Sequence, residues 1–182
     1  LHEIYRQAVL HHHVFPLWNP YICGGTAALA DPEFSLFTPM FALELLFGVP
    51  LGVRLAMFVS LAVGGVGMLA LARRLGMSVV GGLFAAIIAT FGSVTILEMI
   101  EGHVNVFATM WIPWVFWAWH RAVTAQGERR QVNTLLTGVF LALMFYRGGM
   151  YLLFYTAFAF LALILTSRAW RDALRVTIVS GL

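Results

Sequence analysis

Charged residues divide this chain into long apolar blocks. Uncharged stretches of 15 to 23 residues occupy positions 55–72, 75–97, 104–119, 132–146 and 148–167. A helix that spans the hydrocarbon core of a bilayer needs about 20 predominantly apolar residues, with a range of about 17 to 25. The pattern therefore predicts an all-α fold, a polytopic integral membrane bundle with about five complete transmembrane helices.

The two shorter blocks, 104–119 and 132–146, reach the length of a span only with polar residues at their ends. His103, His120 and Gln131 supply that extra length, and terminal arginines can extend to the interface. A re-entrant hairpin made of the two blocks is the alternative, and it stays open at this point.

The connecting loops are asymmetric in charge. All 11 basic residues are arginines, and eight of them lie in the loops 72–78, 120–131 and 167–175. The positive-inside rule places these loops in the cytoplasm, as for a protein of the bacterial inner membrane. Most acids then fall on the extracytoplasmic side: Glu3, Asp31, Glu33, Glu44, Glu98 and Glu101. We expect the functional chemistry there, although a simple tolerance of that side for acids would give the same bias.

Composition excludes several other classes of protein. Hydrophobic residues make up 61% of the chain and charged residues 10%, against about 25% charged in soluble domains. The arginines are spread between apolar blocks, so we expect the lipid bilayer and not a nucleic acid as a partner. A single cysteine, Cys23, forms neither an internal disulfide nor a cysteine metal cluster.

Residues 1–53 are predicted to form an extracytoplasmic loop before a transmembrane bundle of residues 54–182, whose last span is truncated. Apolar residues at helical spacing in the first 13 positions predict an amphipathic helix on the membrane surface. The apolar stretch 34–50 is interrupted by Pro39, which indicates an interfacial or re-entrant helix ended by Pro50. Irregular backbone at membrane depth needs cover, so we expect this loop to wall a polar cavity.

Two acids in the loop are candidates for catalysis and substrate binding. Asp31 and Glu33 flank Pro32, and their carboxylates could orient an acceptor hydroxyl or hold a divalent cation. An Asp-Pro pair is also a common start for a turn or a helix, which would explain both acids structurally.

A second group of candidates lies in the short loop before position 104. Glu98 and Glu101 are three residues apart and share a face if the helix continues, and His103 follows directly. Such a group could bind a metal ion, the one cofactor that the sequence suggests, and we assign catalytic roles to Glu101 and His103 and substrate binding to Glu98. A solvated turn is the alternative interpretation.

The remaining substrate-binding candidates are polar or aromatic residues of the same side. Arg54 and Arg147 could bind a lipid phosphate in a bidentate manner, or simply extend to anionic headgroups. Trp111 begins a series of tryptophans that could line a sugar or polyprenyl groove, although packing roles are common for tryptophan. Asn19, in the sequence PLWNPY, completes the set.

Several motifs resemble those of one bacterial family. The stretches PLWNPYICGGTAALADPEFSLFTP (16–39), LARRLGMSVVGGLFAAIIATFGS (71–93) and EGHVNVFATMWIPWVFWAWHRA (101–122), with the turn RGGMY (147–151), resemble the YfhO-like membrane proteins of the C-type glycosyltransferase superfamily. The resemblance implies a polytopic enzyme that takes a sugar from a polyprenyl-phosphate lipid on the extracytoplasmic face. It also implies an acid just after the first span, which we expect upstream of Leu1, in a longer protein.

Two functions are therefore expected from different classes of protein. The resemblance favours a fragment of a membrane glycosyltransferase whose partner is a polyprenyl-phosphate sugar donor. The alternative is a non-enzymatic transmembrane subunit that scaffolds a larger complex with other membrane subunits.

Overall fold

A computed structural model describes residues 2–19, 24–28, 37–166 and 170–181, and this part of the chain is all-α apart from one two-residue strand pair. The strands are β1 (Trp18–Asn19) and β2 (Thr26–Ala27), which pair antiparallel with Trp18 opposite Ala27. The helices are α1 (His2–Leu10), α2 (Phe41–Phe47), α3 (Val49–Arg74), α4 (Val79–Phe91), α5 (Ser93–Glu101), the 3-10 helix η2 (Val104–Trp111), α6 (Ile112–Thr124), α7 (Gly127–Tyr146), α8 (Met150–Thr166) and α9 (Trp170–Val179).

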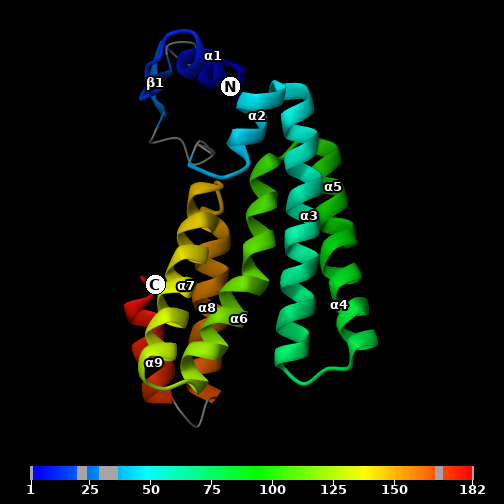
Figure 1. Cartoon of the computed structure of the whole chain (residues 1–182), viewed down its shortest axis with the longest axis vertical. Helices are drawn as coiled ribbons and strands as arrows, with labels where there is room; N and C mark the ends of the chain where they lie inside the picture. The colour runs from blue at the N-terminus through cyan, green and yellow to red at the C-terminus, as the bar shows by residue number, and fades with distance from the viewer. Residues whose placement is uncertain (1, 20–23, 29–36, 167–169, 182) are drawn as a thin grey trace.

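The helices form two groups that run along the long axis of the molecule (Figure 1). Helix α3 packs against α4. Helix α6 packs against α7 and α9, and α8 packs beside them. Contacts of α3 with η2 and α6 join the two groups. Helices α1 and α2 with the strand pair sit over one end, which is the position expected for a loop that covers the mouth of a bundle (Figure 1).

Two helical segments are long and apolar enough to cross a bilayer. They are Val49–Arg74 with 26 residues and the continuous pair α4–α5, Val79–Glu101, with 23 residues. Only 22% and 17% of the most apolar part of these two segments is buried, whereas the core helix of a soluble protein is mostly buried. Helix α8 is apolar but has 17 residues. The all-α architecture is confirmed, and a membrane location is supported by these two segments, whereas five complete spans remain a prediction.

One predicted helix end is wrong. Helix α2 ends at Gly48, whose φ of 78° is a conformation that glycine adopts without a steric penalty. Pro50 instead lies in the first turn of α3, where a proline loses no intrahelical hydrogen bond. Because α3 begins at Val49, Arg54 lies in its second turn. The predicted N-terminal helix is confirmed as α1, whose Tyr5 is buried with Ala28 and Phe41.

The junction between α3 and α6 depends on two glycines. The indole Nε1 of Trp114 donates a hydrogen bond of 2.9 Å to the carbonyl oxygen of Val63. A Cβ atom on Gly67 would lie 2.5 Å from that nitrogen, and one on Gly64 would lie 3.2 Å from the Cβ of Met110. Small residues at these positions let the two helices approach closely.

We expect Gly67→Ala to destabilise the protein by about 1–3 kcal/mol, because the new methyl group has to displace the Trp114 indole. Thermal unfolding of the detergent-purified chain measures the loss. The matched control is Gly65→Ala on the same helix, where the added Cβ meets only the Thr90 hydroxyl, at 3.2 Å. Equal losses for the two variants would contradict this account of the junction.

Candidate functional site

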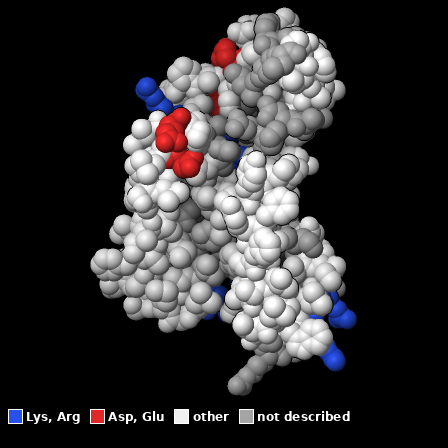
Figure 2. Space-filling model, turned by 180° about the vertical axis from the view of Figure 1, so that it is seen from behind, with Lys and Arg blue, Asp and Glu red and all other residues white. Residues whose placement is uncertain are grey.

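Most of the described acidic side chains lie toward one end of the molecule, and most of the described arginines lie toward the other. One end is formed by α2, the start of α3, the end of α5 and the turn between α7 and α8, and we call it the carboxylate end (Figure 1). The other end is formed by the α3–α4 and α6–α7 connections, and we call it the arginine end. On the face shown in Figure 2, acidic side chains occur only toward the carboxylate end, and arginines occur at both.

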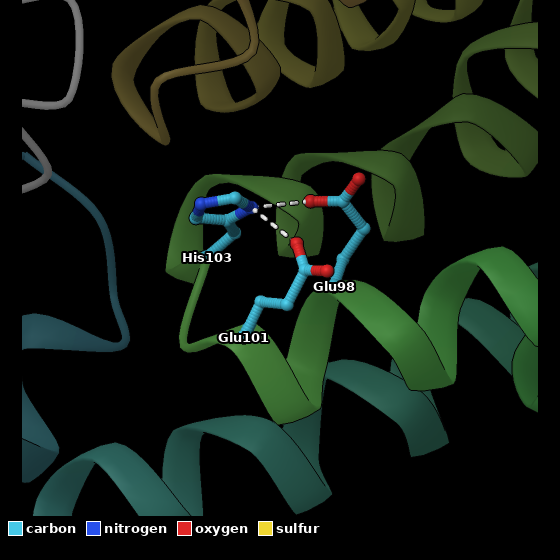
Figure 3. Close-up of side chains that lie close together, drawn as sticks. All are labelled: Glu98, Glu101 and His103. Atoms are coloured by element: carbon cyan, nitrogen blue, oxygen red, sulfur yellow. Dashed lines mark hydrogen bonds and ion pairs between the residues drawn. The ribbon is translucent and has the colours of Figure 1, made fainter.

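Three of the predicted site residues come together where α5 ends. Glu98 and Glu101 lie one turn apart, and Gly102 then takes a left-handed conformation with φ of 82°. This turn folds the chain back, so that the backbone N–H of His103 donates to the carbonyl oxygen of Glu98 at 2.9 Å. The His103 Nδ1 atom lies 2.7 Å from Glu98 Oε2 and 3.6 Å from Glu101 Oε2 (Figure 3).

This three-residue cluster, Glu98, Glu101 and His103, has two chemical uses. Its ligand atoms all lie within 4.8 Å of one another, and its side chains are exposed to solvent or partly so. A neutral imidazole and two carboxylates are a ligand set that divalent cations accept. Without a cation, the carboxylates hold a protonated imidazole or accept a proton from a bound hydroxyl group.

Arg147 is the most unusual cation of the structure. It follows α7 directly, and its residue is only 2% exposed. Its Nε and Nη1 atoms are buried with no hydrogen-bond partner among the described residues, and its Cζ atom lies 5.8 Å from the Phe107 ring centroid. Burial lowers the pKa of the guanidinium below its ordinary value, and the negative charge of Glu44 offsets only part of this effect. Unused donors on a buried guanidinium are suited to an oxyanion.

Glu44 is a buried acid for which the sequence predicts no binding or catalytic role. It is 1% exposed, and its Oε2 atom lies 2.7 Å from the Nδ1 atom of His2. The Nε atom of Arg6 donates a 3.1 Å hydrogen bond to the Glu44 backbone oxygen. The available signal was a single acid within the otherwise apolar sequence FALELLF, since an ionisable residue in such a segment usually has a specific partner or function.

The other predicted site residues that the structure describes lie apart from this cluster. Asp31 and Glu33 lie outside the described residues. Asn19 is buried within the strand pair, and Arg54 is exposed on α3. Trp111 belongs to the hydrophobic core, where its ring stacks on that of Phe140 with 5.9 Å between the ring centroids. Most of its surface is therefore covered by packing against other side chains.

Comparison with known proteins gives no match: no family model, curated protein or solved structure resembles the chain at a significant level. The family resemblance of residues 16–39 and 98–121 therefore stays a prediction. The case for a function depends on the side chains of the carboxylate end.

We expect Glu44→Ala to destabilise the protein by about 3 kcal/mol, because it removes a buried carboxylate with its 2.7 Å contact to His2 and leaves the buried charge of Arg147 less well offset. Thermal or denaturant unfolding of the purified chain measures the change. Glu98→Ala removes a more exposed acid and serves as the control, with an expected loss below about 1 kcal/mol. If both variants lose the same stability, Glu44 has no special structural role.

We expect the purified chain to bind Mn²⁺ through the three-residue cluster, as measured by electron paramagnetic resonance of the free ion. His103→Ala should weaken binding at least about tenfold, since even the loss of an outer partner of a ligand has that effect. His12→Ala, an exposed histidine in another part of the chain, is the control and should leave binding unchanged. Mn²⁺ binding that survives in His103→Ala would remove the imidazole from the ligand set.

Proposed function

We propose that this chain is part of a membrane glycosyltransferase that transfers a sugar from a polyprenyl-phosphate donor on the extracytoplasmic face. The observation that carries the proposal is the buried Arg147 guanidinium, with two nitrogen atoms that have no partner in the described part of the chain. It lies at the end of the molecule that also bears the cluster of Glu98, Glu101 and His103. Such a transfer needs a cation that stabilises the phosphate of the leaving group and a carboxylate that acts as a base.

A membrane location supports the lipid part of the proposal. The two span-length segments expose large apolar side chains along their length, including Phe58, Val66, Phe84, Ile87 and Ile88. Arginines flank the connections at the arginine end, as the positive-inside rule describes for the cytoplasmic side. In this orientation the carboxylate end faces the extracytoplasmic side. The family that the motifs resemble uses polyprenyl-phosphate sugars on that side.

The chemistry of the transfer can be written with the residues at hand. An acceptor hydroxyl attacks the anomeric carbon, and its proton passes to a carboxylate such as that of Glu101. The bond between the anomeric carbon and the phosphate oxygen breaks, and the polyprenyl phosphate leaves with the electron pair. The Arg147 guanidinium stabilises the charge that develops on this leaving group. Because the guanidinium is buried, water is excluded from it.

The remaining candidates have supporting roles in this proposal. His103 orients the Glu98 carboxylate through its 2.7 Å contact and would hold a divalent cation together with both glutamates. A bound cation would supply Lewis-acid stabilisation of the phosphate. Asp31 stays a catalytic candidate on the basis of the sequence motif.

A non-enzymatic subunit is the second candidate, and the exposed face of one helix is compatible with it. Helix α8 exposes a row of large side chains, Tyr151, Phe154, Tyr155, Phe158 and Leu165. Lipid tails would cover this row in an isolated enzyme, and the helices of other subunits would cover it in a complex. Activity measurements separate the two functions.

We expect Arg147→Gln to lower sugar transfer from a polyprenyl-phosphate donor by about 10²–10³-fold, the usual effect of removing one charge-stabilising donor. The assay uses the full-length protein in membranes or detergent and follows transfer of radiolabelled sugar. Arg147→Lys keeps the charge but not the planar pair of donors, so its activity should lie between those of Gln and the parent.

Arg121→Gln is the control for this experiment. Arg121 is exposed at the arginine end and lies over the Trp117 ring at 4.5 Å, so its replacement should leave transfer unchanged. Gel filtration of each variant shows whether it is folded. Full activity in a folded Arg147→Gln protein would end the assigned role of this residue, and a parent protein without any transfer would favour the scaffolding subunit.

A further inference from the structure

A cavity of about 470 Å³ lies at the arginine end between α7 and α9. Its polar lining comes from Arg130, Gln131 and Thr134 of α7 and from Arg175 of α9. This cavity is separate from the carboxylate end, and none of its residues takes part in the proposed sugar transfer. It combines two guanidinium groups with an apolar wall.

The lining changes from polar to apolar along both helices. Helix α7 begins at Gly127, so Arg130 lies in its first turn and Gln131 at the start of its second, and Leu135 lies about one turn beyond Gln131, further from the arginine end. On α9, Arg175 is followed by Val176 and, one turn on, by Val179. A ligand that fills this cavity therefore meets charged groups near the start of α7 and hydrocarbon deeper along the helices.

The two arginines are held differently. The Nη1 atom of Arg130 lies 2.9 Å from Asp172 Oδ1, and its Nε atom donates to the Ala125 carbonyl oxygen at 3.0 Å. These contacts fix one guanidinium at the wall of the cavity. Arg175 is exposed and makes no hydrogen bond or ion pair with another residue that the structure describes. The single charge of Asp172 leaves the two arginines with a positive charge in excess.

The start of α7 adds further donors at the same place. Gln126, the residue before the helix, makes no side-chain hydrogen bond to the first turn. The backbone N–H groups beside Gly127, which lines the cavity, therefore have no side-chain cap, and the positive end of the helix dipole lies there. An anionic group bound between Arg130 and Arg175 would meet these donors as well.

We propose that this cavity binds an anionic phospholipid, with the phosphodiester at Arg130 and Arg175 and the first part of an acyl chain against Leu135, Val176 and Val179. Basic pockets between helices on the cytoplasmic side are known to suit such headgroups. The apolar wall distinguishes the ligand from free phosphate, which would leave Leu135 and Val179 without contacts. The proposal rests on the membrane location of the bundle and does not require sugar transfer.

The test measures the Tm of the purified full chain in a neutral detergent while dioleoyl phosphatidylglycerol, dioleoyl phosphatidylcholine or inorganic phosphate is added. We expect phosphatidylglycerol to raise the Tm in a saturable manner and the other two probes to have little effect. Arg175→Gln should weaken the apparent affinity for phosphatidylglycerol about fivefold, the usual effect of one basic residue at a charged lipid surface.

The matched control is Arg171→Gln, which removes an arginine of the same helix that lies over the Trp170 ring at 5.3 Å and outside the cavity. Its affinity for phosphatidylglycerol should equal that of the parent. Val179→Trp, which fills the apolar part of the cavity, should weaken binding without a change of charge.

Three results would overturn the proposal: equal stabilisation by the two phospholipids, the same stabilisation by inorganic phosphate, or equal losses in Arg171→Gln and Arg175→Gln. A protein that binds phosphatidylglycerol through Arg175 but transfers no sugar would refute the proposed function and leave this site in place. A protein that transfers sugar but does not distinguish the two phospholipids would do the reverse.

Discussion

The structure of the carboxylate end depends on the interactions of one buried group, the Glu44 carboxylate. A carboxylate that is 1% exposed needs compensating partners, and here they come from different parts of the chain. His2 on α1 contacts it at 2.7 Å, and the charge of Arg147, in the turn after α7, acts on it electrostatically. One acid on the short helix α2 therefore links the N-terminal segment to the end of the bundle. The charge of the same acid offsets part of the effect of burial on the Arg147 guanidinium.

The junction of α3 with α6 has the complementary task of holding the two groups of helices together. Apolar surface gives little specificity between helices in lipid, because the tails are as apolar as the side chains. The contact is specified instead by shape and by one polar bond: Trp114 occupies the space that Gly67 leaves and donates to the Val63 carbonyl oxygen. The same chain segment carries η2, whose Phe107 lies beside Arg147. Contacts of η2 with α3 and α7 thus place Phe107 against the buried guanidinium at the end of α7.

Features that depend on local spacing could be predicted from the sequence, and those that depend on distant contacts could not. The apolar blocks correspond to α3, the pair α4–α5, α7 and α8, whereas the block 104–119 is divided between η2 and α6. The short separation of Glu98, Glu101 and His103 explains their proximity, since the turn at Gly102 is local. The end of α2 was assigned to Pro50 because a proline was treated as a terminator, whereas Gly48 ends one helix and Pro50 begins the next. Glu44 and Arg147 are about one hundred positions apart, and no periodicity in the sequence reports that both side chains are buried.

Burial decides what each arginine of this protein can do. Arg147 and Arg175 carry the same group, but the first is 2% exposed with unused donors and the second is exposed at the edge of a cavity. A desolvated guanidinium interacts strongly with an anion because the surrounding dielectric is low, and it holds that anion in one geometry. An exposed guanidinium interacts more weakly and tolerates several headgroup positions, which suits an exchangeable lipid. The difference in burial therefore separates the phosphate that we propose for the carboxylate end, held in one geometry, from the lipid headgroup that we propose for the arginine end.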